Sequence, residues 1–177
     1  FFITVLAHIP ILLALGRREG SESVVTGATF PTIPLGMLLL EVGIIAGLAL
    51  AAAIPQLNRR VRTVLAVTGL AVCSGTLVHV TGGYIEAHFH FFVVLGVFAL
   101  YEDWLPFALG FVYVALSHGV FGTIDSSLVY NHAPAIANPW IWGGIHAGFV
   151  TGLARARTIN WSGTAKSPQT APQPLHQ

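Results

Sequence analysis

Charged residues are scarce in this sequence, and cysteine and methionine are almost absent. Asp, Glu, Lys and Arg make up 8% of the 177 residues, whereas they make up about 25% of an average soluble domain. This scarcity excludes an ordinary water-soluble globule. The single cysteine, Cys73, excludes an intrachain disulfide and a zinc site built from thiolates.

The few charges nearly cancel, with 8 Lys and Arg residues against 7 Asp and Glu residues. Without a basic run that could neutralise a series of phosphates, no nucleic acid is expected as a partner. The sequence also has no nucleophile elbow, phosphate loop or paired-carboxylate site. An enzyme is therefore the less favoured class, although the sequence leaves it open.

Long apolar runs take the place of charge, since 54% of the residues are hydrophobic. Crossing the hydrocarbon core of a bilayer as a helix takes about 20 predominantly apolar residues. We expect an all-α fold, a polytopic membrane helix bundle of about six transmembrane helices, with the lipid bilayer as its first partner. The expected helices cover about residues 1–15, 31–54, 62–80, 86–101, 105–121 and 139–155.

The composition changes near residue 158. Residues 1–158 are expected to form the membrane domain, and residues 159–177, rich in Ser, Thr, Pro and Gln, a flexible tail or linker.

Basic residues predict the orientation, because cytoplasmic loops are enriched in Lys and Arg. Arg59, Arg60 and Arg62 lie between the second and third expected helices, and Arg155 follows the sixth. Both places fall on one side of the bundle. We therefore expect a multi-pass protein of the inner (plasma) membrane with a cytoplasmic C-terminus.

Eight histidines are the compositional anomaly. In the expected topology, all but His176 fall in the outer half or the middle of the bundle. An ionisable side chain in hydrocarbon is costly unless it faces the interior and finds a partner, so such residues are functional candidates by default. A single helical histidine is more often a hydrogen-bonded interior residue, but a group at one depth favours a shared ligand.

The densest polar stretch is HVTGGYIEAHFHFF, residues 79–92. On a helix, Glu86 and His90 share a face, whereas His88 lies about 200° round the axis and points elsewhere. The glycine pair within this stretch allows a tight turn. That turn is expected to bring His79 back near Glu86 and His90.

Imidazoles with one carboxylate suit copper, zinc, iron or nickel, and haem is the other common use of such histidines. Spacing does not choose between a metal ion and haem. The axial pairs considered for haem join His79 or His90 to His118 or His146. The expected metal ligands are His79, Glu86, His88, His90, His118 and His146.

Secondary candidates for the site are His8, Glu41, Asp125 and His132. Glu41 lies in the middle of the second helix and needs a proton or a partner. His8, at a similar depth, is the expected partner, and the pair would either tie two helices together or relay a proton. Asp125 is typical of a turn or cap residue, and residues 130–132 are a candidate lid over the outer site.

The strings EAHFHFFV and YEDWLPF, followed by YVALSHGVFG, YNHAPAIANPW and IHAGFV, carry a family resemblance. Residues 77–152 closely resemble a family of His-rich membrane input regions at the N-terminus of bacterial diguanylate cyclases, sensor histidine kinases and chemotaxis receptors. AHIP at 7–10 extends the likeness loosely to the first helix. The positions that match the family are His8, His79, Glu86, His88, His90, His118, His132 and His146. Ser117 stands where the family pattern has a second histidine.

The resemblance implies a sensory, signal-transducing membrane module that acts on a cytoplasmic output domain or partner chain. Combined with the histidines, it favours an input module with an outer His/Glu site for a metal ion or haem. Two alternatives stay open: a small membrane oxidoreductase subunit with haem or copper, and a proton-coupled transporter. A homodimer also stays open.

Overall fold

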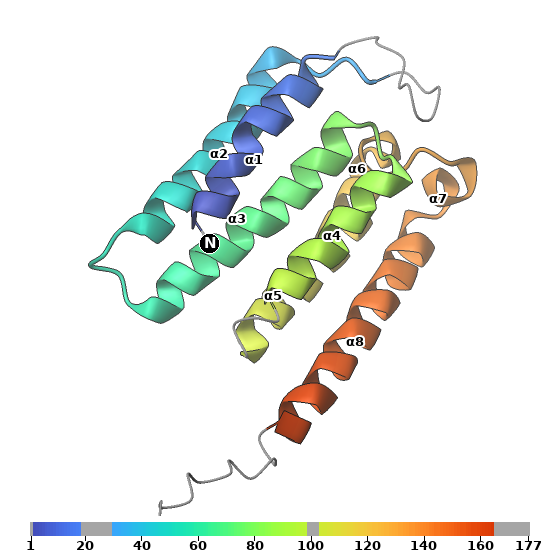
Figure 1. The fold of residues 1–177 in the computed structure, drawn as a ribbon. Helices are drawn as coiled ribbons and strands as arrows, with labels where there is room; N and C mark the ends of the chain where they lie inside the picture. Colours follow the sequence, from blue (N-terminus) through green and yellow to red (C-terminus); the bar gives the residue numbers. More distant parts are fainter. Residues whose placement is uncertain (1, 19–29, 99–102, 165–177) are drawn as a thin grey trace, which may run out of the picture.

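The computed structural model describes residues 2–18, 30–98 and 103–164, with side chains described as far as residue 156. Within these ranges the regular structure is entirely helical. The helices are α1 (Phe2–Gly16), α2 (Leu35–Ala53), α3 (Arg59–Val80), α4 (Ile85–Phe98), α5 (Trp104–Leu116), the π-helix η2 (Ser117–Phe121), α6 (Gly122–Ile124), the 3-10 helix η3 (Ser126–Leu128), α7 (Ala133–Ala137) and α8 (Pro139–Thr164). Figure 1 shows the long helices running side by side.

The all-α prediction is confirmed for the described residues, the first five expected helices agree with α1 to α5 within a few residues, and the sixth agrees with α8 at its start. Helix α8 runs to Thr164, past residue 158, where we expected the tail to begin. The rest of the expected tail, residues 165–177 with His176, lies outside the described residues, as does the expected end of the fourth helix at 99–101.

Three helical runs are long and apolar enough to cross a membrane: α2, α3 and the continuous stretch Trp104–Ile124. Helices α1 and α4 are shorter apolar helices. The chain is therefore a multi-pass membrane protein, and crossing by α1, α4 and α8 stays a prediction. Orientation stays a prediction as well.

Sequence-encoded caps and turns set the helix boundaries. Asn58 accepts a hydrogen bond from the backbone N–H of Val61 at 2.9 Å and so begins α3. The backbone between α3 and α4 reverses at Gly82 and Gly83, whose φ angles of 70° and 76° lie in the left-handed region that only glycine adopts cheaply. Asp103 caps α5 by accepting from the N–H of Leu105.

Helix α3 is the centre of the bundle. It packs against α1 and α2 on one side and against α4 and α5 on the other, and α5 in turn packs against α8 (Figure 1). One hydrophobic core runs through these helices, with Val67, Leu70, Phe98 and Val114 among its buried members. Cys73 is buried in this core as a free thiol.

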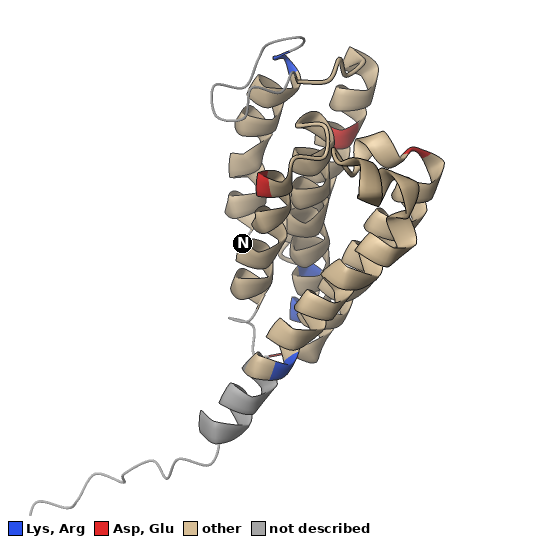
Figure 2. Cartoon of the chain, turned by 90° about the vertical axis from the view of Figure 1, so that its right-hand side faces the viewer, with Lys and Arg blue, Asp and Glu red and all other residues tan. Residues whose placement is uncertain are grey.

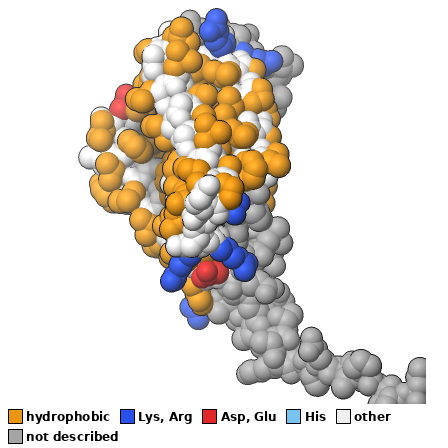
Figure 3. All heavy atoms as spheres, turned by 90° about the vertical axis from the view of Figure 1, so that its left-hand side faces the viewer, with side chains coloured by type: hydrophobic (Ala, Val, Ile, Leu, Met, Phe, Trp, Pro, Cys, Tyr) orange, Lys and Arg blue, Asp and Glu red, His pale blue; other side chains and the backbone are white. Residues whose placement is uncertain are grey.

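The outer surface is mostly apolar, as the orange side chains in Figure 3 show. Exposing so large an apolar surface to water would be unfavourable in free energy, whereas in a bilayer such a surface is expected to face lipid. The Lys and Arg residues of the described chain gather at the end of the bundle where α3 begins, toward the C-terminal end of α8, and beyond the end of α1 (Figure 2).

Candidate metal centre

Three histidines from three different helices meet near the end of the bundle opposite to the start of α3. His88 comes from α4, His118 from η2 and His146 from α8. Each offers one ligand nitrogen, and these atoms lie within 4.8 Å of one another. The ring centroids are 5.2 Å apart for His88 and His118, 5.3 Å for His88 and His146, and 4.8 Å for His118 and His146. We call this group the trihistidine centre.

The same local hydrogen bond orients all three rings. In each, Nδ1 donates to the backbone carbonyl four residues earlier, at 2.8 Å for His88, 2.9 Å for His118 and 2.8 Å for His146. A neutral imidazole that donates from Nδ1 leaves a lone pair on Nε2. The centre therefore presents three Nε2 acceptors, in the tautomer that metal-binding histidines commonly adopt.

Two of these acceptors lack a partner. The Nε2 atoms of His88 and His118 are buried and, among the described residues, accept no hydrogen bond. The two residues are only 4% and 1% exposed. Leaving a buried polar atom unpaired costs about 1–3 kcal/mol, so the residues present fit a ligand that takes lone pairs, and a metal ion does this directly.

The π-helix at Ser117–Phe121 places His118, and the sequence did not predict it. A π-turn adds one residue to an α-helix, which rotates the following side chains by about 100° relative to an uninterrupted helix. Such turns are frequent at functional sites. Gly143 of α8 lies against His118, because a Cβ at this position would lie 3.4 Å from the Cβ of His118, an ordinary van der Waals contact.

An aromatic side chain covers the centre, as the candidate lid at 130–132 predicted in part. Tyr130 is 2% exposed. Its ring stacks on His88 at an interplanar angle of 10° and meets His118 edge on. Its hydroxyl donates to the carbonyl of Pro139 at 3.1 Å, and burial raises the pKa of the phenol to about 12.

The α3–α4 turn supports this lid from beneath. At Gly83, a Cβ would lie 2.6 Å from the backbone nitrogen of Tyr130, so no larger residue fits there. His132 packs edge on against Trp142, with ring centroids 4.6 Å apart. His132 thus borders the lid and is not a member of the trihistidine centre.

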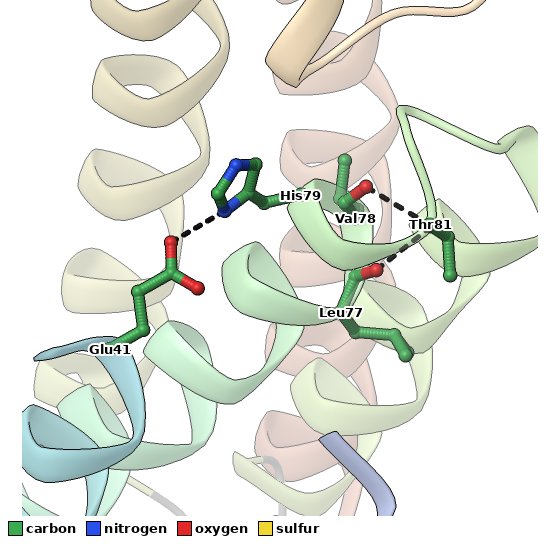
Figure 4. Close-up of polar contacts among 5 residues, drawn as sticks. All are labelled: Glu41, Leu77, Val78, His79 and Thr81. Atoms are coloured by element: carbon green, nitrogen blue, oxygen red, sulfur yellow. Dashed lines mark hydrogen bonds and ion pairs between the residues drawn. The ribbon is translucent and has the colours of Figure 1, made fainter. Parts of the chain in front are cut away.

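The expected pairing of Glu41 with His8 is wrong. Figure 4 shows that Glu41 of α2 reaches His79 of α3, with Oε1 and Nδ1 2.6 Å apart. The partner differs because His79 ends α3 on the side that faces α2, which packs along it. The pair ties these two helices together within the bundle.

His8 instead pairs with His90, and this contact forms a second histidine group. Their Nε2 atoms lie 3.1 Å apart, and Nδ1 of His90 lies 2.8 Å from the hydroxyl of Ser74. Nδ1 of His8 donates to the carbonyl of Thr4 at 2.7 Å. The hydrogen-bonding nitrogens of both rings are therefore occupied by protein groups.

The structure thus divides the predicted ligand set. The 200° separation of His88 from His90 along α4 is as expected, but both directions lead into the protein: His88 faces η2 and α8, whereas His90 faces α1 and α3. Glu86 is exposed on α4. Asp125 is an exposed cap that accepts from the N–H of Ser127 at 3.0 Å, as expected.

Ser74 is the polar partner that the sequence reasoning missed. A serine within an apolar span is itself a signal, because its hydroxyl needs a hydrogen-bonding partner in hydrocarbon. The sequence does not say which helix supplies that partner.

Comparison with known proteins gives one informative likeness. No protein-family model matches the chain, and no solved structure matches it significantly. The chain is 54% identical over 175 residues to the transducer protein Htr8 of Halobacterium salinarum. This likeness covers 99% of the chain and 27% of Htr8, so the chain spans about a quarter of the length of that relative.

Proposed function

We propose that this chain is the sensory input region of a membrane transducer, and that the trihistidine centre binds a metal ion that changes the packing of α8. The likeness to Htr8 supports the signalling role, since that protein is named a transducer and the likeness covers 99% of this chain. The output, in the same polypeptide or in a partner chain, would lie on the cytoplasmic side.

The observation that carries the metal proposal is the pair of buried, unpartnered Nε2 atoms of His88 and His118 beside His146. Three neutral imidazoles with an open further position are a ligand set used for zinc, and imidazole also binds copper and iron well. Copper has the highest affinity in the divalent series. We therefore propose a copper or zinc ion, with iron as the weaker binder.

The spacing of the rings favours a bare ion over haem. A bis-histidine haem needs its two axial imidazoles on opposite faces of the macrocycle. The ring centroids of His118 lie only 4.8 and 5.2 Å from those of His146 and His88, which leaves no room for a macrocycle between them. His79 and His90, the other axial candidates, are engaged by Glu41 and by Ser74 and His8.

Helix α8 is the proposed route of the signal. Its 26 residues give it a length of about 39 Å, which exceeds the hydrocarbon core of about 30 Å. It carries His146 within its first half and passes Arg155 at the opposite end of the bundle. A ligand shifts an equilibrium only if it binds one packing better than the other, so the metal must favour one position of α8 against η2.

The test combines a metal titration with a distance measurement. The protein in nanodiscs is titrated with Cu²⁺ or Zn²⁺, and spin labels at positions 60 and 155, both exposed, report the distance from α3 to α8. We expect one ion per chain and a change in the distance distribution that is absent in His146→Gln. The matched control His90→Gln should keep both.

The two halves of the proposal fail separately. Absence of stoichiometric binding by folded protein would overturn the metal centre. Stoichiometric binding with an unchanged distance distribution would leave the centre in place and overturn signalling through α8.

A further inference from the structure

A cavity of about 300 Å³ lies beside the trihistidine centre, between α2, α3 and η2. Its lining includes Glu41 and His79 and also Ser117 and His118. Most of its remaining wall is apolar and includes Phe91 from α4. The cavity is therefore distinct from the metal centre and shares only His118 with it.

The mouth of the cavity faces lipid. Met37, Ile44 and Phe121 line the cavity and are also 39, 47 and 51% exposed on the outer surface. Met37 and Ile44 lie on α2, which is long and apolar enough to cross the membrane. A molecule that enters by this route comes from the hydrocarbon and must be soluble in lipid.

One polar atom in this wall lacks a partner. Oε1 of Glu41 is taken by Nδ1 of His79 at 2.6 Å, whereas Oε2 is buried and makes no hydrogen bond among the described residues. Figure 4 shows the second oxygen directed away from the His79 ring. A buried carboxylate oxygen without a donor is costly, and a donor from a bound molecule removes that cost.

The volume limits the ligand. Pockets for drug-sized molecules span about 300–1,000 Å³, so this cavity takes only a small one. We propose that it binds a small, lipid-soluble molecule with an apolar body and one hydroxyl donor, of the alkylphenol type, whose O–H donates to Oε2 of Glu41. This proposal is independent of whether the trihistidine centre holds a metal ion.

The test uses a pair of probes that differ only in the donor: 2,6-diisopropylphenol and its methyl ether. Binding of each radiolabelled probe to the protein in nanodiscs is measured at equilibrium, with empty nanodiscs subtracted to remove partitioning into lipid. Because a hydrogen bond to a charged group is among the stronger ones, we expect saturable binding of the phenol at least about tenfold tighter than of the ether.

The variant Glu41→Gln tests the acceptor. Its amide oxygen can keep the bond to His79, which turns the amide N–H₂ toward the cavity and replaces an acceptor by a donor. The preference for the phenol should fall to within about threefold or reverse in favour of the ether. Glu86→Gln is the matched control, because Glu86 is exposed and lies outside the cavity lining, and it should keep the tenfold preference.

A second pair of variants leaves Glu41 and His79 unchanged. It keeps the proposal testable if Glu41→Gln fails to fold. Ile44→Trp places a large ring at the mouth and should weaken binding of both probes at least about fivefold. Leu40→Trp, on the same helix and 64% exposed but outside the cavity lining, should leave binding unchanged. Equal binding of phenol and ether by the wild type, as an acyl chain in the cavity would give, would overturn the proposal. So would an effect of Leu40→Trp as large as that of Ile44→Trp.

Discussion

Two groups of histidines lie in the same bundle and use their nitrogens in opposite ways. In the trihistidine centre, every Nδ1 donates to the carbonyl four residues earlier, and the Nε2 atoms of His88 and His118 have no partner within the described part of the chain. In the second group, His8 and His90 face each other through Nε2, and Ser74 holds the remaining nitrogen of His90.

This difference distinguishes the proposed binding role of the trihistidine centre from the helix-linking role of the second group. The second group uses its ring nitrogens to link α1, α3 and α4, and Oε1 of Glu41 links α2 to α3 through His79. The trihistidine centre makes no such link between helices through its Nε2 atoms, so holding it together without a ligand costs free energy. Both groups are built from histidines, but burial also differs between them, since His88 and His118 are buried whereas His8 and His90 are partly exposed.

The largest expected effect is on metal affinity. His118→Gln removes one of three ligands and should weaken binding about 100-fold or more, beyond the 10- to 100-fold typical of losing an outer hydrogen bond. His90→Gln should change affinity by less than about threefold, because His90 lies outside the centre. Competition titration with a chromophoric chelator measures both.

Equal losses in the two variants would contradict the division into two groups. Circular dichroism on each variant provides the control that the helices are retained.

In the metal-free protein, a substitution outside the trihistidine centre should cost more stability than a substitution within it. Glu41→Leu leaves His79, only 11% exposed, without its partner, and should lower the free energy of unfolding by about 1–3 kcal/mol. His88→Leu removes a buried Nε2 that has no partner among the residues the structure describes, and should change the free energy of unfolding by less than about 1 kcal/mol. Unfolding in mixed micelles of increasing SDS content measures both free energies. A larger loss of stability in His88→Leu than in Glu41→Leu would contradict the division between the trihistidine centre and the linking contacts.

Two adjacent glycines sharpen the role of the lid. Gly82→Ala and Gly83→Ala both force alanine into left-handed backbone, at a cost of about 1–2 kcal/mol each. Only Gly83→Ala also pushes on the backbone of Tyr130, since the Cβ at position 82 meets the side chain of Pro31. Metal affinity should therefore fall about tenfold in Gly83→Ala and stay within about threefold in Gly82→Ala. Isothermal titration calorimetry measures both affinities. Equal metal affinities of Gly82→Ala and Gly83→Ala would show that Tyr130 does not contribute to metal binding.

The smallest expected effect concerns the hydroxyl of the lid. Tyr130→Phe loses one hydrogen bond to the carbonyl of Pro139 and should destabilise by about 0.5–1.5 kcal/mol near neutral pH. Burial raises the pKa of Tyr130 to about 12 in the folded protein, above its ordinary value of about 10. The stability that this shift represents is fully present below pH 10 and is lost as the pH rises toward 12.

The advantage of the wild type over Tyr130→Phe should therefore be constant from neutral pH up to about pH 9 and shrink above pH 10. Unfolding curves at a series of pH values check this. A difference that grows with pH would show that the phenol ionises more easily in the folded state.

The sequence predicted the helices because lipid imposes a strong pattern: long apolar runs that begin after a capping residue such as Asn58 or Asp103, or end at glycine, are typical of membrane helices. It also predicted that histidines would gather near one end. It did not predict which of them meet, because the partner of a side chain depends on how helices pack and not on its depth. Glu41 illustrates this, since His8 was expected as its partner from depth, whereas the packing of α2 against α3 selects His79.

The π-turn at Ser117 was beyond sequence reasoning for a related reason. A single extra residue in a helical turn leaves no pattern in composition, yet it changes the direction of His118. The sequence shows Gly143 only as a small residue on a helix, which favours close helix packing. It does not indicate that His118 is the residue packed against it.

The central claim is that His88, His118 and His146 bind one ion through nitrogen. X-ray absorption spectroscopy of the protein loaded with one equivalent of Zn²⁺ tests it most directly. The account predicts a first shell with three imidazole nitrogens at about 2.0–2.1 Å, reduced to two in His146→Gln and unchanged in His90→Gln. A shell without imidazole scattering, or one that His146→Gln leaves intact, would contradict it.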